Sequence, residues 1–206
     1  MLIVCIAALT GLLCFCSFTW GVSRHFRHDS AMPRGMRLLS YGSLAALLWF
    51  LVRLATDGPS PAWPLAIVLM LAALGLFWSA VHATRRQRLT LAFSSDAPMF
   101  LHRHGPYAYV RHPFYSAYSL FWIATSLSSP GVIQWLAPVA LVWAYVHAAR
   151  TEERKFANSP LATDYRLYQH STGMLFPLLW RDARSWAIVR GGPAANPVDR
   201  WRRDRI

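Results

Sequence analysis

From Pro113 to Ala149 the chain reads PFYSAYSLFWIATSLSSPGVIQWLAPVALVWAYVHAA, without a single Asp, Glu, Lys or Arg. Pro130 divides this stretch into two apolar runs, Pro113–Ser129 and Gly131–Ala149. A run of about 18 apolar residues is long enough to cross the hydrocarbon core of a bilayer as an α-helix. The apolar residues are continuous rather than alternating, which favours helices over a barrel. The stretch therefore predicts a transmembrane helical hairpin with a tight turn.

Three further apolar runs precede this hairpin, namely Met1–Val22, Leu38–Leu54 and Trp63–Val81. Among them only Leu38–Leu54 contains a charged residue, Arg53, near its end. Of all 206 residues only 15% are charged, whereas a soluble domain has about 25%. The sequence thus predicts an all-α, polytopic membrane protein with about five transmembrane helices.

The connections between these runs alternate between arginine-rich and arginine-free. The basic ones are Arg24–Arg37 with four Arg, His82–His112 with five Arg, and the chain after Ala149 with ten Arg and one Lys. The other two connections contain no Arg or Lys. Ala55–Ala62 has one Asp as its only charged residue, and Ser128–Gly131 has no charged residue. By the positive-inside rule we expect the N-terminus outside and the C-terminus in the cytoplasm. Near the outer face, Arg53 can meet Asp57 one helical turn on.

The formal net charge of +12 invites comparison with nucleic-acid-binding proteins. No aromatic–basic nucleic-acid motif accompanies it, so we attribute the charge to membrane topology and to anionic lipid head groups, and expect no nucleic-acid partner. Arg outnumbers Lys twenty to one, which indicates a GC-rich bacterial genome and hence a bacterial inner membrane.

The chain divides into three parts by composition. Residues 1–83 contain three apolar runs with short loops, residues 84–180 hold most of the unusual polar residues, and residues 181–206 form a basic tail that we predict to be flexible. Motifs of soluble enzymes such as G-x-G, the phosphate loop, H-E-x-x-H and C-x-x-C do not occur. These absences favour a site built between membrane helices.

The first candidate site segment is GPYAYVRHPFY, Gly105–Tyr115, where the hairpin begins. Pro113 suits the first turn of a helix, because its missing N–H costs nothing there. Arg111 and His112 then lie at the helix start, where backbone N–H groups and the helix dipole also favour an anion. An interfacial belt of aromatic and basic residues is the alternative interpretation of the same segment.

The second segment contains Glu152 and Glu153, the only glutamates of the chain, where the hairpin ends. Two membrane crossings and a turn separate His112 from Glu152, so both ends of the hairpin emerge at one surface, roughly 10 Å apart. Arg111 and His112 can therefore face the glutamates across one cytosolic pocket. Such a pocket, with aromatic faces, suits a zwitterionic aromatic cofactor such as S-adenosylmethionine.

Three pieces together resemble the superfamily of isoprenylcysteine carboxyl methyltransferases and phospholipid methyltransferases. They are GPYAYVRHPFYSAYSL, RTEERKFANSPLATDYRLY and LFP, within residues 101–177. The resemblance implies an integral membrane enzyme that binds S-adenosylmethionine on the cytosolic side of the hairpin. Carried over position by position, it implies that the cofactor pocket is lined by Tyr107, Arg111, His112, Tyr115 and Glu153, with Glu152 and Arg150 beside them.

The expected reaction is direct in-line methyl transfer to a lipophilic acceptor that arrives from the bilayer. A carboxylate acceptor is favoured because it is already ionised near neutral pH and needs no strong base; nitrogen or sulfur acceptors remain open. Accordingly no residue is assigned to acid–base catalysis, and no metal is expected. Residues 1–83 match no family that we can name, so the acceptor's identity is not implied.

Three other interpretations fit parts of the sequence. Membrane sterol reductases, which use NADPH, resemble this superfamily through R-H-x-N-Y, but Phe114 occupies the Asn position here. A metal site could use His102, His104 and His112, although membrane di-iron enzymes need many more histidines. A membrane accessory protein without activity would bind no S-adenosylmethionine.

Overall fold

Six α-helices dominate the computed structural model, which describes residues 1–26, 33–87, 89 and 100–178. They are α1 (Leu2–Trp20), α2 (Arg34–Asp57), α3 (Trp63–Thr84), α4 (Pro113–Ser128), α5 (Leu136–Ala157) and α6 (Ala162–Ser171). Three short helices accompany them, η1 (Gly21–His25), η2 (Gly105–Ala108) and η3 (Val132–Trp135). Within the described ranges no strand occurs, apart from an isolated bridge between Val110 and Gly173. The all-α prediction is confirmed.

Four helical segments are long and apolar enough to cross a membrane: Leu2–His25, Arg34–Asp57, Trp63–Thr84 and Val132–Ala157. The fifth predicted span forms as α4 but has only 16 residues. At 1.5 Å per residue it is about 24 Å long, short of a hydrocarbon core of about 30 Å. It falls short because the chain leaves the helix at Ser129, before Pro130. The structure thus contains the predicted hairpin with one arm shorter than expected.

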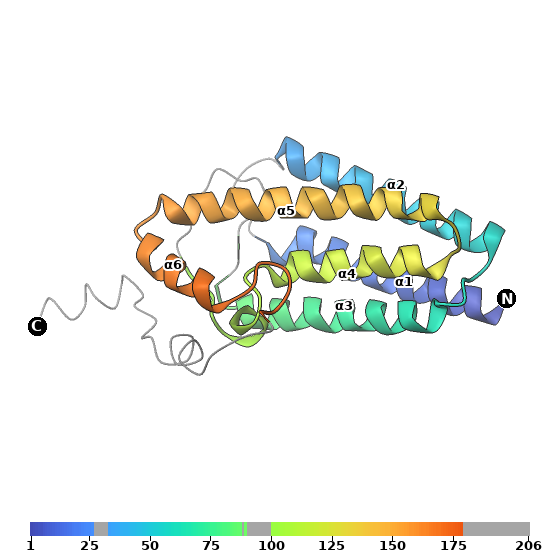
Figure 1. Cartoon of the computed structure of the whole chain (residues 1–206), viewed down its shortest axis with the longest axis horizontal. Helices are drawn as coiled ribbons and strands as arrows, with labels where there is room; N and C mark the ends of the chain where they lie inside the picture. The colour runs from blue at the N-terminus through green and yellow to red at the C-terminus, as the bar shows by residue number, and fades with distance from the viewer. Residues whose placement is uncertain (27–32, 88, 90–99, 179–206) are drawn as a thin grey trace, which may run out of the picture.

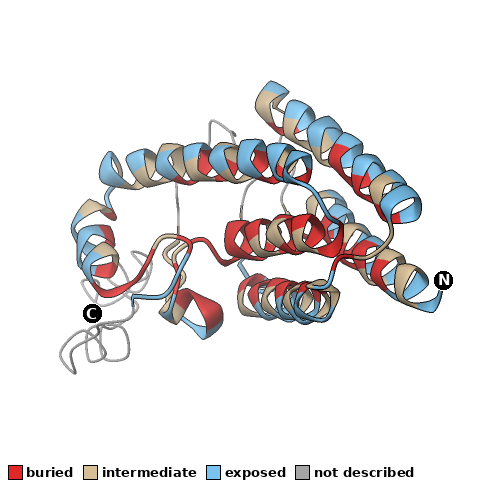
Figure 2. Cartoon of the chain, turned by 45° about the vertical axis from the view of Figure 1, so that its right-hand side comes forward, coloured by how far each residue is buried: buried red, intermediate tan, exposed pale blue. Residues whose placement is uncertain are grey.

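Helix α4 lies in the middle of the bundle (Figure 1), and 12 of its 16 residues are buried (Figure 2). Its most extensive contact is with α3, followed by α5. Small residues such as Ser119 and Ala124 allow neighbouring helices to approach closely. Hydroxyl groups in this helix donate to backbone carbonyls, as Ser128 does to Ala124 at 2.9 Å, so their burial leaves few polar groups unsatisfied. A short helix enclosed by longer ones is the result.

Aromatic side chains fill the contact between α1, α3 and α4. Phe18 packs against Phe77 and Phe121, with ring centroids 5.0 and 5.5 Å apart. Gly21 allows this approach, because a Cβ there would lie 2.7 Å from the Phe77 ring. The core thus depends on a side chain being absent at Gly21.

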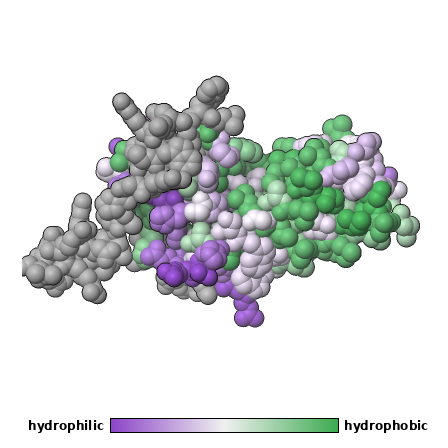
Figure 3. All heavy atoms as spheres, turned by 90° about the horizontal axis from the view of Figure 1, so that it is seen from below, coloured by the Kyte–Doolittle hydropathy of each residue, from purple (hydrophilic) through white to green (hydrophobic). Residues whose placement is uncertain are grey.

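The two ends of the bundle differ in polarity. One end carries the N-terminus and the α2–α3 and α4–α5 connections, and the other carries α6 and the start of α4 (Figure 1). Figure 3 shows hydrophobic surface over the N-terminal end and hydrophilic surface toward the other. At the N-terminal end Arg53 forms the predicted ion pair with Asp57 and lies over the Trp49 ring. The basic tail 181–206 and residues 90–99 of the predicted cytoplasmic loop lie outside the described residues.

Candidate functional site

The site begins with the turn that leads into α4. Gly105 has a φ of +61°, a conformation that favours glycine, and it opens the short helix η2. Pro113 then occupies the first turn of α4, as predicted, and His112 is its N-cap. Arg111 and His112 are thereby fixed at the helix start, at the same end of the bundle as the last turn of α5 (Figure 1).

A second segment, the loop after α6, pairs with this turn along its backbone. The N–H groups of Arg111 and His112 donate to the carbonyls of Gly173 and Met174 at 2.8 and 3.1 Å, and the Gly173 N–H donates to Tyr109 at 3.3 Å. A Cβ at Gly173 would lie 1.7 Å from the backbone oxygen of Phe176, so the loop tolerates only glycine there. The loop after α6 therefore holds the two cationic residues in place.

Arg111 binds Glu153 across the hairpin, with 2.8 Å between Nε and Oε1. Its guanidinium also donates to the carbonyls of Gln169, at 3.2 Å, and Thr172. The remaining carboxylate oxygen of Glu153 accepts from the Gln169 amide at 3.1 Å. Arg111 thus ties together α4, α5 and the end of α6.

His112 lies between the two glutamates. Its Nε2 is 3.3 Å from Oε1 of Glu153, and its Nδ1 is 3.5 Å from Oε2 of Glu152. Burial alone would lower the pKa of His112, but the hydrogen bonds and charges of both carboxylates outweigh burial and raise the pKa above its usual value. The two carboxylates thus favour the imidazolium form of His112, in which both ring nitrogens can donate.

Tyr115 completes the contacts of Glu152, since its hydroxyl donates to Oε1 at 2.5 Å. Its ring stacks on His112 with centroids 5.6 Å apart and on Tyr145 of α5 at 5.8 Å. A cation on an aromatic face at this distance is stabilised by the ring quadrupole. Both glutamates thus reach one cluster, formed by Arg111, His112, Tyr115, Glu152 and Glu153, which we call the ion cluster.

Tyr107 is buried beside the ion cluster. Its carbonyl accepts from the Tyr168 hydroxyl at 2.6 Å, while its own hydroxyl is buried without a hydrogen-bond partner among the described residues. Burial, together with the nearby Tyr168 and the charge of Glu152, raises the pKa of Tyr107 well above its usual value. The phenol therefore remains protonated and can donate to a ligand.

Arg150, the seventh residue predicted for the site, is exposed on α5. Its carbonyl accepts from Arg154 at 3.3 Å, and among the described residues its side chain forms no hydrogen bond or ion pair with the ion cluster. The structure thus brings together Arg111, His112, Tyr115 and both glutamates, with Tyr107 adjacent and Arg150 outside.

The predicted cationic and anionic walls are in direct contact, because long side chains span the distance between the neighbouring helix ends. The sequence analysis also missed Gln169, which binds Glu153 through its amide and Arg111 through its carbonyl. Its only signal in the sequence was its place directly after Tyr168, the last residue of the motif piece RTEERKFANSPLATDYRLY.

The contacts of the described residues also bear on the alternative interpretations. Phe114, at the position of the reductase Asn, is buried against Phe26, Phe77 and His25, so it packs the core and lines no polar site. Among the described residues no group of three His, Cys, Asp or Glu side chains is placed to hold a metal ion.

Comparison with known proteins gives one family match. Residues 63–159 match the family model of the phospholipid methyltransferases. This range, a little under half of the chain, begins at α3, earlier than the resemblance noted from the motifs, and ends before α6. No curated protein and no solved structure matches the chain. Over residues 63–159 the chain is therefore similar to the phospholipid methyltransferases, which are membrane methyltransferases that use S-adenosylmethionine.

Proposed function

We propose that the ion cluster, with Tyr107, is the place where S-adenosylmethionine binds. The observation that carries this proposal is the contact of Arg111 and His112 with Glu152 and Glu153 at one end of the bundle. The cluster holds two cations and two carboxylates and is therefore neutral. A zwitterionic amino-acid group can replace these internal partners one for one, so that no buried charge is left unpaired.

The protein residues have separate roles in this proposal. His112 and Arg111 bind the cofactor's carboxylate, and Glu152 and Glu153 bind its ammonium or ribose hydroxyls. The buried Tyr107 hydroxyl, which has no partner among the described residues, gains one when the cofactor binds. Bound S-adenosylmethionine supplies an electrophilic methyl group on a sulfonium. The exposed Arg150 lies beside this site, where it can attract the cofactor without contacting it.

We propose a carboxylate on a lipophilic molecule as the methyl acceptor. His112 lies between two carboxylates that favour its protonated form, and Tyr115 already donates to Glu152. Neither group is placed to remove a proton, so an acceptor that is ionised before it binds fits best. The residues then accelerate the reaction by orienting the reactants and excluding water, which can lower a barrier by about 7–11 kcal/mol. Amine or thiol acceptors would need a base, and the two carboxylates of the cluster are already engaged, Glu153 by Arg111 and Glu152 by Tyr115.

We further propose that α4 crosses the membrane inside the bundle, giving five crossings with the N-terminus outside. Its ends lie at opposite ends of the bundle (Figure 1), and the surrounding longer helices shield a helix that is too short to match the bilayer alone. The arginine-rich connections then all face the cytoplasm, in keeping with the positive-inside rule. A bacterial inner membrane suits the composition.

One experiment tests cofactor and acceptor together. The purified protein, in nanodiscs of its host's lipids, is given S-adenosylmethionine with a tritiated methyl group, and extracted lipids are treated with alkali. We expect labelled lipid that releases volatile methanol, the behaviour of a methyl ester. Label that resists alkali would indicate an N- or S-methylated acceptor, and calorimetric binding of NADPH but not of S-adenosylmethionine would overturn the assignment of the ion cluster.

A further inference from the structure

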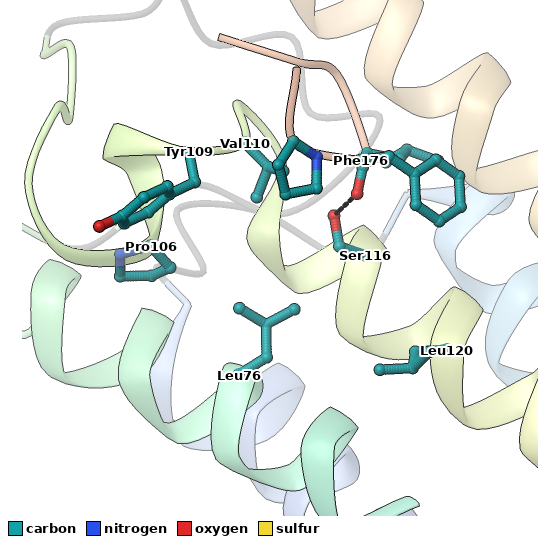
Figure 4. Close-up of a pocket in the computed structure, with 9 residues that line it drawn as sticks. Leu76, Pro106, Tyr109, Val110, Ser116, Leu120 and Phe176 are labelled. Carbon is teal, nitrogen blue, oxygen red and sulfur yellow. Dashed lines mark hydrogen bonds between the residues drawn. The ribbon is translucent and has the colours of Figure 1, made fainter. Parts of the chain in front are cut away.

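A pocket of about 340 Å³ beside the start of α4 has no charged residue in its lining (Figure 4). Leu76 comes from α3, Leu120 from α4 and Leu175 from the loop after α6. The Ser116 hydroxyl is already within hydrogen-bond distance of the carbonyls of His112, at 3.0 Å, and Leu175, at 2.7 Å. This pocket therefore offers no charged group to a ligand, in contrast to the exposed side of α5.

The exposed side of α5 changes from apolar to basic along its length. Leu136 and Trp143 are 68% and 70% exposed. His147 is exposed one turn later and stacks on the Trp143 ring, with centroids 5.8 Å apart, and Arg150 and Arg154 are exposed beyond it. Because successive residues of a helix are rotated by about 100°, positions 143, 147, 150 and 154 share one side of the helix. We call His147, Arg150 and Arg154 the basic face.

The two glutamates of the same helical turns point elsewhere. Glu152 and Glu153 bind the other members of the ion cluster. Among the described residues neither Arg150 nor Arg154 forms an ion pair. The Arg154 Nε donates to the Arg150 carbonyl at 3.3 Å, so the Arg154 side chain folds back toward Arg150. The last turns of α5 thus direct carboxylates toward the ion cluster and guanidinium groups away from it.

The basic face lies near the depth at which hydrocarbon gives way to lipid head groups. The apolar span that includes α5 begins at Val132, which is 87% exposed. The helical rises of η3 and α5 place Arg150 about 28 Å from Val132 along the axis, close to the hydrocarbon thickness of about 30 Å. Long Arg side chains at this depth reach the head-group layer, where lipid phosphates are the available anions.

The neighbouring helix adds positive charge at the same end of the bundle. Helix α2 packs against α5, and Arg34 and Arg37 in its first turn are exposed. This turn lies toward the end of the bundle that carries α6 (Figure 1). The membrane surface beside the last turns of α5 is therefore positive, which attracts anionic head groups.

We propose that the basic face binds the phosphate of one anionic phospholipid of the cytoplasmic leaflet, whose acyl chains lie along Leu136 and Trp143. Arg binds a phosphate through two parallel N–H donors, and the His147 ring adds a donor closer to the hydrocarbon. Because the same turns carry Glu152 and Glu153, the bound lipid stabilises the ion cluster from the outside. The choice of leaflet rests on the proposed topology, and the site does not depend on the assignment of methyl transfer.

Native mass spectrometry of the full-length protein in detergent tests the choice of lipid. Dioleoylphosphatidylglycerol is compared with dioleoylphosphatidylcholine, which has the same acyl chains but no net charge. We expect the first phosphatidylglycerol to bind about tenfold more tightly or better, because two arginines attract its net charge. Equal binding of the two lipids would overturn the proposal.

A matched pair of double substitutions tests the location. Arg150→Gln with Arg154→Gln removes two charges from the basic face, whereas Arg85→Gln with Arg86→Gln removes two exposed charges directly after α3, at the same end of the bundle. All four side chains are exposed, so both variants should fold. We expect the first variant to bind phosphatidylglycerol about tenfold more weakly and the second to bind it almost unchanged. An equal loss in both would show a general attraction to positive charge and refute a defined site.

Thermal unfolding separates a lipid site from a site for any anion. Phosphatidylglycerol should raise the unfolding temperature of the unsubstituted protein, because a ligand that binds the folded state stabilises it, but not that of the variant with Arg150→Gln and Arg154→Gln. Inorganic phosphate should stabilise neither, since it makes no contact with Leu136 or Trp143. Equal stabilisation by inorganic phosphate, or a lipid-dependent shift that persists in the variant, would overturn the inference. Neither measurement uses S-adenosylmethionine, so its outcome is independent of the proposed cofactor site.

Discussion

Arg111 and Glu153 form an ion pair of 2.8 Å although 42 positions separate them along the chain. Their side chains are only 12% and 15% exposed, so the pair is much less screened by water than a surface salt bridge. It joins the start of α4 to the last turns of α5 and so fixes the open end of the hairpin. Both the stability of the fold and the geometry of the proposed cofactor site depend on this pair.

Replacing Glu153 with Gln should weaken the cofactor site and the fold together. The amide loses its charge-assisted contacts with Arg111 and His112, each typically worth about 1.5–3 kcal/mol. We expect a roughly ten- to hundredfold loss of affinity for S-adenosylhomocysteine and a lower unfolding temperature in detergent. Calorimetry and thermal unfolding measure the two effects.

Glu152→Gln is the matched control for this substitution. Glu152 is more exposed and binds Tyr115 and His112 but makes no contact with Arg111 among the described residues. We expect a similar direction of change in affinity but a smaller loss of stability. Equal, small effects of both substitutions, with affinity intact, would contradict the placement of the cofactor at the ion cluster.

The stability of the protein should depend on pH through His112. Its pKa is raised in the folded state, so its stabilising effect is fully present below its unfolded value of about 6.5 and is lost as pH rises through the folded value. The difference in unfolding temperature between the unsubstituted protein and His112→Gln should therefore shrink from pH 6 toward about pH 9. A difference that stays constant would show that His112 is not held as an imidazolium.

Gly173→Ala should disrupt the loop that holds Arg111 and His112. The added methyl group would meet the Phe176 carbonyl, and we expect a loss of stability of about 1–3 kcal/mol or more with weaker cofactor binding. Gly75→Ala is the control, because a Cβ at Gly75 has no atom within 4 Å and alanine favours a helix by about 0.5–1 kcal/mol. Thermal unfolding compares the two, and equal behaviour would argue against a tight loop.

Phe114→Asn tests the distinction from reductases. The substitution restores the reductase-like Asn, but it buries an amide among Phe26, Phe77 and His25. We expect destabilisation of about 3–5 kcal/mol, as for other large losses from a core, and no binding of NADPH. Phe114→Leu should cost much less, which unfolding in detergent can measure. Gain of NADPH binding would show that position 114 faces a ligand.

The membrane orientation can be tested by labelling two single cysteines in intact cells, with Cys5, Cys14 and Cys16 replaced. Val132→Cys lies in the exposed α4–α5 connection and should react with an impermeant maleimide from outside. Arg166→Cys, exposed on α6, should react only after the membrane is permeabilised. Labelling of both from the same side would rule out the proposed five crossings.

Much of the fold could be predicted from patterns among residues that are close together in the sequence. Apolar runs between charged connections predicted the helices, and the spacing of Arg53 and Asp57 predicted their ion pair. The hairpin also predicted that the residues around His112 and Glu153 would meet, because its two ends must return to the same side.

Features that depend on the third dimension could not be predicted in this way. The composition of Pro113–Ser128 does not indicate that this helix is short and that longer helices pack around it. The roles of Gln169 and Gly173 arise because the chain after α6 returns to the start of α4. A single Gln or Gly in the sequence does not indicate that it will contact such a distant segment. The pocket beside Ser116 likewise depends on side chains from three separate segments.

The backbone pairing between Val110 and Gly173 also has a consequence for biosynthesis. Arg111 and His112 are translated early, but the carbonyls that hold their backbone lie in the loop after α6, which leaves the ribosome only after both arms of the hairpin have been made. The ion cluster therefore cannot reach its final geometry while the hairpin is being inserted. A nascent chain that stalls within α6 would have its membrane helices but would lack the backbone hydrogen bonds that hold Arg111 and His112 in place.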